Sequence, residues 1–227
     1  MATRIDREQV VGTALRLLND VGLEGLTLRR IAGELGVQAP ALYWHVKNKQ
    51  VLLDEMATEL ERRAAVDFDA ARDVARGVAR DGAGEEGIPW QETLAQATRS
   101  IRRVLLRYRD GGKVFGGTHF RGTEYAEHMD QLFAALTEAG FTLDAAARAV
   151  MTAYSYTIGY VVEEQAMRGD VATGEGGFDV DARAERLRAH PLAAAAGYEM
   201  FTEYDEGYEA GLAAVVAGVE VTLLRGS

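Results

Sequence analysis

The chain has 227 residues, of which 48% are hydrophobic, and its 25 basic and 35 acidic residues give a net charge of −10. The absence of cysteine excludes disulfides and thiolate metal ligands and fits a reducing compartment. No apolar run reaches 18 residues and the N-terminal stretch MATRIDREQ is polar, so we expect no membrane span, no secretory signal and a cytoplasmic protein.

The first predicted helix begins after Asp6. Gln9 completes a capping box with Asp6, and apolar residues recur at three- and four-residue spacing as far as Val21. We expect this helix to close before Gly22.

Two short helices joined by a tight turn are predicted over residues 27–46. Thr27 is placed to cap a helix over 28–35, Gly36 suits a turn with positive φ, and Pro40 fits the first turn of a second helix that ends near 45–46. This is the pattern of a helix-turn-helix, whose second helix enters the DNA major groove, although an ordinary helical hairpin has the same pattern. Basic residues on both sides favour the helix-turn-helix, because a phosphate backbone attracts them.

Longer helices are predicted beyond Asn48, which is placed to cap the first of them. Their expected ranges are 49–66 (with room to extend to 80), 90–108, 123–139, 143–168 and 205–224. The glycine-rich stretches 81–87 and 109–122 are predicted as loops, and 169–189 as a mobile loop. No strand pattern is present, so the predicted fold is all-α, with a helix-turn-helix head over 1–48 and a larger helical body over 49–227.

The segment LTLRRIAGELGVQAPALYWHVKNKQVLLDEM resembles the most specific part of the TetR family of bacterial transcriptional regulators. Three stretches of the body, SIRRVLLRYRDGGKV, TIGYVVEEQ and EGYEAGLAAVVAGVEVTLL, are similar to the tetracycline-responsive members of that family. The resemblance implies a homodimer whose two heads bind a palindromic DNA operator and which a small molecule in the body releases. A net charge of +2 over residues 1–50 and of −12 over the remainder fits contact with DNA through one end only.

The resemblance also assigns DNA contacts. Arg29 matches a position that reaches a base edge, where a guanidinium bonds guanine O6 and N7, although a phosphate contact explains it equally well. Tyr43, His45 and Lys49 match positions that hold the DNA backbone, and Thr27 fits a phosphate contact at a helix N-terminus. The implied DNA-binding residues are Thr27, Arg29, Gln38, Ala39, Pro40, Ala41, Tyr43, Trp44, His45 and Lys49.

Two alanines depart from the tetracycline-responsive members, in which polar side chains on both sides of the motif proline contact bases. Ala39 and Ala41 flank Pro40 here, and alanine offers only a methyl group to a thymine methyl. We therefore expect a different operator, with Gln38 taking over part of the base contacts. Trp44 either stacks on the sugar-phosphate backbone or packs inside the head.

The implied ligand pocket departs as well. In tetracycline-responsive members a histidine binds the magnesium of the drug chelate, and Phe115 stands at that position here. A second histidine and an asparagine hold the polar edge of the drug in those members, and they are replaced by Ala65 and Ala97. A glutamate and a threonine of the same pocket are kept as Glu163 and Thr118. We expect a small, largely apolar or aromatic effector other than magnesium-tetracycline, with no cofactor and no resident metal. The implied ligand-binding residues are Ile101, Phe115, Thr118, His119, Phe120, Met151, Tyr154, Tyr156 and Glu163, although core packing is the better explanation for any single one of the aromatic rings.

The helices over 143–168 and 205–224 are expected to pair with their copies in a homodimer. One face of the last helix carries small residues at three- and four-residue spacing beside an apolar stripe, which a monomer would expose to water. These residues are Gly211, Ala214 and Gly218, and Leu212, Val215, Val219 and Leu223.

Two other functions are alternatives to this one. An enzyme would need converging titratable groups, yet no nucleophile motif or glycine-rich phosphate loop occurs and the four histidines are scattered, so we expect no catalysis. A DNA-binding activator or architectural protein without ligand control is the alternative among DNA-binding proteins, and loss of operator binding on adding a ligand separates it from a repressor.

Overall fold

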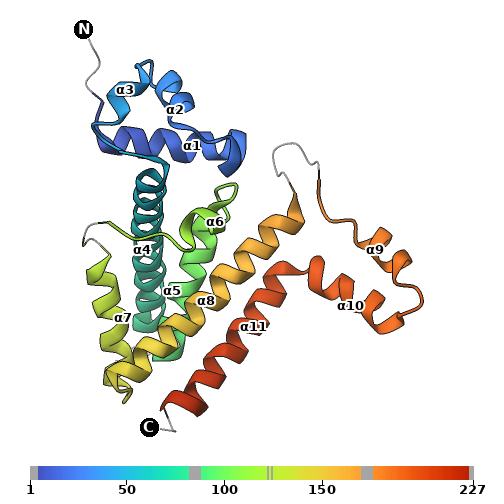
Figure 1. Ribbon diagram of the computed structural model, residues 1–227. Coiled ribbons are helices and arrows are strands. Elements are labelled where there is room, and N and C mark those ends of the chain that lie inside the picture. The colour runs from blue at the N-terminus through green and yellow to red at the C-terminus, as the bar shows by residue number, and fades with distance from the viewer. Residues whose placement is uncertain (1–4, 82–87, 122, 124, 170–175, 225–227) are drawn as a thin grey trace. The chain divides into compact units, whose positions relative to one another are not determined.

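The computed structural model describes residues 5–81, 88–121, 123, 125–169 and 176–224 and, among these, the side chains of all but 75–81. Every regular element in these ranges is helical, which confirms the all-α fold class (Figure 1). The elements are α1 (Arg7–Gly25), α2 (Leu28–Glu34), α3 (Ala39–Leu42), α4 (Lys49–Asp81), α5 (Trp90–Leu105), α6 (Gly111–Phe115), α7 (Ala126–Glu138), α8 (Leu143–Arg168), α9 (Val180–Arg186), α10 (Pro191–Phe201), α11 (Tyr204–Val219) and a π-helical turn over Glu220–Leu224.

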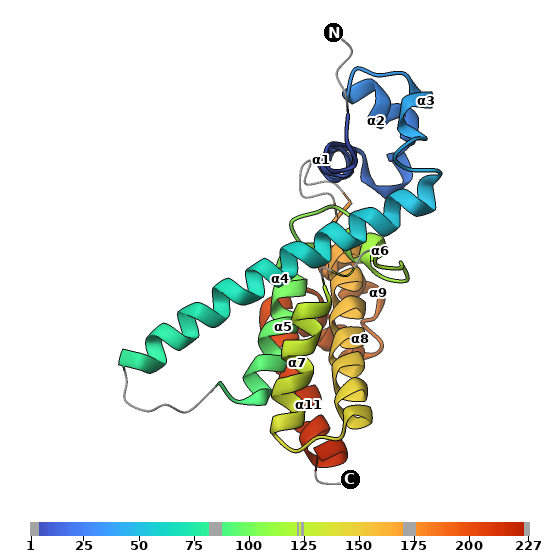
Figure 2. The same cartoon turned by 90° about the vertical axis from the view of Figure 1, so that its left-hand side faces the viewer.

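Two compact units share the chain. The first contains Met1–Gly87 and Arg99–Gln131, and the second contains Ile88–Thr98 and Leu132–Ser227, so that α5 and α7 each contribute to both. In the first unit α1, α2 and α3 gather at the N-terminal end of α4, which runs on as one long helix (Figure 2). In the second unit α8 and α11 lie side by side, and α9 and α10 pack on each other.

Local capping explains most of the helix boundaries. The predicted capping box is present at α1, where the Gln9 N–H donates to Asp6 Oδ1 at 2.8 Å and the Asp6 N–H donates to Gln9 Oε1 at 3.0 Å. Asn48 Oδ1 accepts from the Val51 N–H at 2.9 Å and caps α4, as expected. The helix α1 continues past its predicted end to Gly25, with a kink at Gly22, whose φ is +66°.

Two predicted loops are wrong in part, because each contains a short helix. The segment 109–122 contains α6, and the segment 169–189 contains α9, which Asp179 caps by accepting from the Ala182 N–H at 2.8 Å. The helix expected over 90–108 ends at Leu105, and the chain then turns so tightly that a Cβ at Gly111 would collide with the carbonyl oxygen of Leu105. Of the predicted loop 81–87, residues 82–87 lie outside the described part of the chain.

Each unit has its own apolar interior. The interior of the first unit includes Leu15, Leu18, Leu26, Ile31, Leu42, Leu52, Met56 and Leu60, all fully buried. In the second unit Trp90 packs edge-on against Phe141, with ring centroids 4.8 Å apart, among residues of α5, α7, α8 and α11. Such burial is the main stabilising contribution to either unit.

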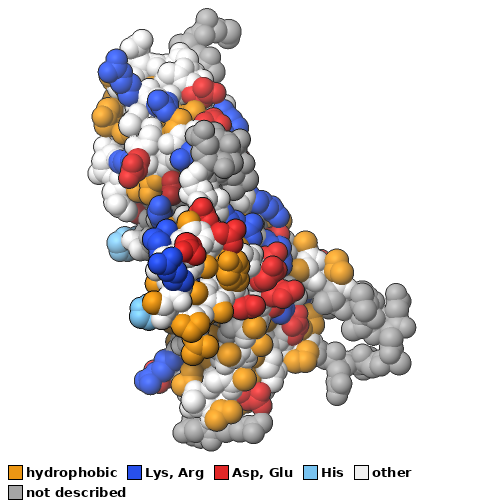
Figure 3. All heavy atoms as spheres, turned by 90° about the vertical axis from the view of Figure 1, so that its right-hand side faces the viewer, with side chains coloured by type: hydrophobic (Ala, Val, Ile, Leu, Met, Phe, Trp, Pro, Cys, Tyr) orange, Lys and Arg blue, Asp and Glu red, His pale blue; other side chains and the backbone are white. Residues whose placement is uncertain are grey.

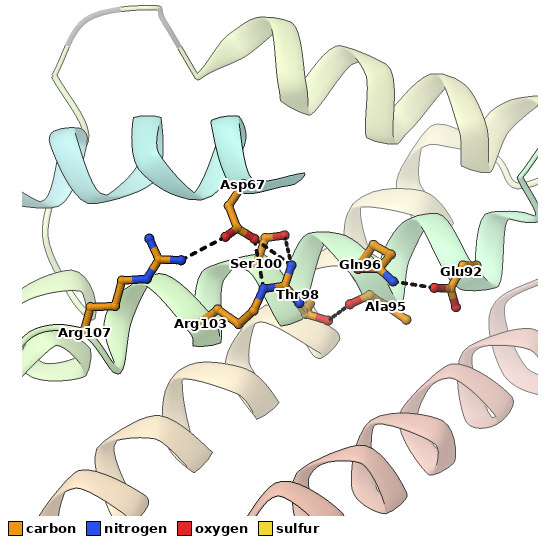
Figure 4. Close-up of polar contacts among 8 residues, drawn as sticks. All are labelled: Asp67, Glu92, Ala95, Gln96, Thr98, Ser100, Arg103 and Arg107. Atoms are coloured by element: carbon orange, nitrogen blue, oxygen red, sulfur yellow. Dashed lines mark hydrogen bonds and ion pairs between the residues drawn. The ribbon is translucent and has the colours of Figure 1, made fainter. Parts of the chain in front are cut away.

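An ion-pair network joins α4 to α5 within the first unit (Figure 4). Arg103 donates to Asp67 Oδ2 from Nη2 at 2.6 Å and from Nε at 3.0 Å, and Arg107 donates to Asp67 Oδ1 at 3.2 Å. Burial alone would raise the pKa of Asp67, but the two arginines and Ser100 hold it below its usual value. The ionised carboxylate therefore fixes the C-terminal half of α5 to the middle of α4.

The last helix does not contradict the expectation of no membrane span, because a core helix of a soluble protein can pass the same test of length and composition. The segment Tyr204–Leu224 is long and apolar enough to cross a membrane by length and composition, with a mean hydropathy of 1.4 in its most apolar window, of which 22% is buried within the chain. Its apolar character comes from alanine, valine, leucine and glycine spread around the helix, with exposed side chains such as Val221. On the face drawn in Figure 3, hydrophobic side chains reach the surface in several groups, with charged side chains between them.

Candidate DNA-binding face and ligand region

The turn between α2 and α3 is built as the sequence predicts. Thr27 Oγ1 accepts from the Arg30 N–H at 3.2 Å and caps α2, Gly36 has a φ of +66°, and Pro40 lies in the first turn of α3. The helix α3 is shorter than predicted, since it ends at Leu42 and continues only as an irregular turn.

Four apolar side chains fix the orientation of this motif. Ile31 and Ala32 of α2, Leu42 of α3 and Val46 after it are all buried, and α2 packs on α3. Because Leu42 points into the head, the opposite side of α3 faces solvent.

The outward side of the motif carries most of the predicted DNA-binding residues. Arg29, Gln38, Pro40, Tyr43 and Trp44 are all exposed. Trp44 is 90% exposed, so the packing role considered for it is excluded within this chain. An indole left in water is a costly apolar surface in the free protein, and it favours burial against a partner. The remaining motif residues, Ala39, Ala41 and His45, are half-buried at the edge of this surface.

Lys49 has a structural contact that the sequence did not indicate. Its Nζ donates to the carbonyl oxygen of Leu23 at 2.9 Å, while the Leu23 N–H donates to Asp110 Oδ2 at 2.9 Å. The backbone on both sides of Leu23 is thus held, by α4 on one side and by the turn before α6 on the other. The ammonium of Lys49 has three donors, so this bond leaves it able to contact a phosphate as well.

Asp110 lies at the centre of this junction. It has a φ of +56°, a conformation that asparagine and aspartate tolerate better than other non-glycine residues, and its Oδ1 accepts from Lys113 at 2.9 Å. Burial would raise the pKa of Asp110, but the bonds from Leu23 and Lys113 keep it below its usual value. Asn19 adds a further link by accepting from the Arg109 N–H at 2.8 Å. In the sequence, the only indication of this role is that Asp110 is a residue type that tolerates a positive φ and directly precedes two glycines.

Part of the predicted ligand-binding set gathers around the C-terminal end of α6. Phe115 is buried and packs against Phe120 with ring centroids 5.2 Å apart, and Phe120 in turn packs against Tyr125 at 5.5 Å. Thr118 donates its hydroxyl to the carbonyl oxygen of Phe115 at 2.9 Å. Ile101 of α5 is half-buried, and His119 is exposed.

The segment after α6 is tied to α4 through Asp54, a buried carboxylate. It accepts from Gln50 Nε2 at 2.9 Å, from the His119 N–H at 3.3 Å and from Arg121 Nη2 at 3.3 Å. Although desolvation raises the pKa of Asp54, these bonds outweigh it and lower the value. Sequence reasoning missed this anchor, because nothing in the local pattern distinguishes Asp54 from a surface residue of α4.

The members of the predicted set on α8 point in different directions. Tyr156 donates its hydroxyl to the carbonyl oxygen of Tyr208 at 2.9 Å and stacks on the Tyr208 ring, with centroids 5.6 Å apart, so it packs between α8 and α11. Met151 and Glu163 are exposed, and Tyr154 is half-buried. Met151 lines a different face of α8 from Tyr156, and the structure does not bring the two together.

An apolar groove of about 750 Å³ runs between α8 and α11 on that other face. Of the residues expected at a dimer interface, Ala214, Val215, Gly218, Val219 and Leu223 line it. Two others lie elsewhere, since Gly211 packs under the Tyr156 ring and Leu212 is buried beside Tyr208. One face of α11 therefore packs on α8, and another face lines the groove, which is open to solvent.

A helix-turn-helix with an exposed basic and aromatic face, joined to a larger helical body, defines a class of DNA-binding transcriptional regulators. The chain belongs to the TetR family of bacterial regulatory proteins. The family model "Bacterial regulatory proteins, tetR family" matches residues 10–56, and the model "Tetracyclin repressor-like, C-terminal domain" matches residues 83–223.

Curated relatives and solved structures support the same assignment over nearly the whole chain. The chain is 39% identical over 219 residues to the class A tetracycline repressor protein from transposon 1721 of Escherichia coli, a match covering 96% of this chain and 91% of that protein. A possible TetR family transcriptional regulator from Streptomyces coelicolor A3(2) is 35% identical, with a TM-score of 0.76, and 96% of this chain and 100% of that chain are covered. A TetR variant from Acinetobacter baumannii AYE, solved in complex with minocycline, is 27% identical with a TM-score of 0.68, covering 97% and 99% of the two chains.

Proposed function

We propose that this chain is a cytoplasmic, ligand-responsive repressor that binds a palindromic DNA operator as a homodimer. Residues 1–48 are its DNA-binding domain, and residues 49–227 bind the effector and form the dimer. The observation that carries the proposal is the outward face of α2 and α3, where Arg29, Gln38 and Trp44 are exposed before and after the glycine turn at Gly36.

The effector in this proposal is a small, largely apolar or aromatic molecule other than magnesium-tetracycline. Tetracycline repressors are among the relatives, but three of the residue types that hold the drug chelate in tetracycline-responsive members are replaced here, while Glu163 and Thr118 are kept. Phe115 takes the place of the metal-binding histidine and packs on Phe120, while the buried Ala65 and half-buried Ala97 replace two polar anchors. A phenyl ring and two methyl groups supply no ligand to a cation and no hydrogen bond to a polar drug edge.

Release of DNA is proposed to pass through the junction at Leu23. The aromatic residues at the end of α6 are five to ten positions from Asp110, and Asp110 holds the end of α1. A ligand that displaces α6 would therefore move the turn before it and with it the head. For two heads that must fit successive major grooves, about 34 Å apart, such a change lowers the affinity of both at once.

The dimer is proposed to form through the groove between α8 and α11. Its small and apolar lining is an exposed patch in a single chain, and a second copy would cover it through a closed twofold arrangement. Two half-sites bound together then give an operator affinity that a single head does not reach.

Selection of bound duplexes from a random pool, followed by a ligand screen on the selected operator, tests the proposal. We expect a palindromic duplex to be enriched and an apolar or aromatic compound to release the protein from it. Because Asp110 links the turn before α6 to α1, Asp110→Asn should raise the concentration of compound that this release requires. Binding that no compound weakens would favour a regulator without ligand control.

A fluorescence titration with tetracycline and magnesium tests the effector claim separately. We expect no binding at micromolar drug, and tight magnesium-dependent binding would refute the claim. The variant Phe115→His is the matched comparison, because it returns a metal ligand to the chain.

A further inference from the structure

The surface that α3 presents to DNA is almost without hydrogen-bonding side chains. Ala39, Pro40 and Ala41 offer only methyl and methylene groups, and Leu42 is buried in the head. Gln38 lies directly before α3, is exposed and makes no capping hydrogen bond, so its amide is available to a base. In the proposed complex, the major groove therefore faces the amide group of Gln38 and the methyl and methylene groups beside it.

The charged side chains around α3 further limit which bases this helix can recognise. Within residues 27–49, all of which the structure describes, Glu34 is the sole acidic side chain, and it lies 3.8 Å from Arg16 at the far end of α2. Cytosine is recognised through its N4 donor by an acceptor such as a carboxylate, and guanine through O6 and N7 by arginine or lysine. The motif thus has no carboxylate beside α3 for cytosine, and its exposed basic residues that could recognise guanine lie outside α3, with Arg29 and Arg30 on α2 and Lys47 in the turn after α3.

We infer that α3 recognises consecutive A·T pairs in each half-site of the operator. The Gln38 amide donates to N7 and accepts from N6 of one adenine, whereas Ala39, Pro40 and Ala41 pack on the C5-methyl groups of neighbouring thymines. Amide orientation follows this pattern: the NH₂ group faces N7 and the carbonyl oxygen faces the N6 amino group. The inference rests on the proposed function, because it describes the operator that the proposed repressor binds.

Selection from a random pool is carried out in parallel with the full-length wild type, Gln38→Ala and Lys47→Ala. Wild type should enrich a palindrome with an A·T run in each half-site. Gln38→Ala should lose roughly 5- to 150-fold of the preference for adenine at one position per half-site. Lys47 is exposed, basic and in the turn after α3, so Lys47→Ala should weaken all sequences alike and leave the base preferences unchanged.

The thymine methyl groups are tested by replacing single thymines of the selected operator with deoxyuridine, which removes the methyl and keeps every base-pairing group. For wild type we expect about a fourfold loss of affinity per contacted methyl. Ala39→Gly and Ala41→Gly should each abolish the difference between thymine and uracil at one position. The ratio of affinities for the two duplexes does not depend on how much either variant weakens the helix.

The outcomes separate this inference from the proposed function. Failure to enrich any duplex would count against operator binding itself. An enriched palindrome whose half-sites lack the A·T run, an unchanged adenine preference in Gln38→Ala, or equal affinities for thymine and uracil would overturn the inference while leaving the repressor intact.

Discussion

Arg29 and Lys49 are both exposed and basic, but their surroundings in the head differ. Lys49 is bonded to the carbonyl oxygen of Leu23, whereas Arg29 lies in the first turn of α2 and is exposed, as are Gln38 and Trp44. In the proposed DNA complex, a guanidinium on α2 is suited to a base, and an ammonium at the start of α4 is suited to a phosphate.

Replacing each with alanine distinguishes these roles. Arg29→Ala should relax base preference at one position per half-site, at a cost of about 1–3 kcal/mol in discrimination. Lys49→Ala should weaken all sequences about equally and lower the salt dependence of binding by about one phosphate contact. Binding isotherms at several salt concentrations, on matched and mismatched duplexes, measure both effects; identical profiles for the two variants would refute the assignment.

Glu61, on α4, predicts a specific pH dependence of stability. Burial raises its pKa to about 6, and the nearby His128 opposes the shift. Near pH 4.5 and below, the carboxyl is protonated in the folded chain at little cost; as the pH rises through 6, the folded chain must ionise it, and the stability associated with the neutral form is lost. Glu61→Gln should therefore be more stable than wild type at pH 7.5 by about 1–2 kcal/mol, with a much smaller difference at pH 4.5.

Urea unfolding at the two pH values measures this difference, with Glu59→Gln as the control on the same helix. Burial raises the pKa of Glu59 too, but hydrogen bonds from Arg62 and Arg63 outweigh it and lower the value. Glu59→Gln should thus lose stability at pH 7.5, opposite in sign to Glu61→Gln. Equal effects of Glu61→Gln at both pH values would show that the carboxyl is not held away from water.

At the scale of elements, the packing of α8 on α11 depends on glycine. A Cβ at Gly211 would collide with the hydroxyl oxygen of Tyr156, which bonds the Tyr208 carbonyl. Gly211→Ala should destabilise the folded chain by about 1–3 kcal/mol, because the ring must move and its hydrogen bond is lost. Gly159→Ala on α8 is the control, since its Cβ meets nothing within 4 Å and should be neutral or stabilising by up to about 1 kcal/mol. Equal urea midpoints for the two variants at one protein concentration would contradict this packing.

The helices with strong local signals could be predicted from the sequence. Asp6 with Gln9, Thr27 and Asn48 each provide a capping oxygen next to an apolar pattern, and their helices begin where predicted. The helices α6 and α9 could not, because short glycine-rich or charged segments form helices only with tertiary support. For α6 that support is the close approach of Gly111 to Leu105, which no local pattern encodes.

The candidate DNA-binding face could be predicted from the sequence better than the ligand region, because the first depends on local pattern and the second on contacts between distant segments. The exposed face of α2 and α3 follows from local rules, since a glycine turn and a buried Leu42 fix which side chains point outward. Tyr156 and Met151 share α8, and only the position of α11 decides that one packs inward while the other lines the outer groove. Contacts between distant segments, such as Asp110 with Leu23, were likewise beyond local pattern.

At the scale of the whole molecule, the groove between α8 and α11 predicts the oligomeric state. Gly218→Glu introduces a charge among the apolar residues of the groove and should leave one chain's mass, 24.7 kDa, in light scattering at micromolar concentration, where wild type gives twice that mass. Ala213→Glu adds the same charge at an exposed position of α11 that does not line the groove, and it should remain dimeric. A dimeric Gly218→Glu would place the interface elsewhere.

Sedimentation of the wild-type chain with a fluorescent duplex tests the central claim, dimeric binding to a palindrome, most directly. Two duplexes are compared, the selected palindrome and the same length with one half-site scrambled. We predict a complex of two chains on the palindrome and an affinity for the scrambled duplex at least tenfold weaker, because only one head finds its site. One chain per duplex, with equal affinity for both, would contradict the account.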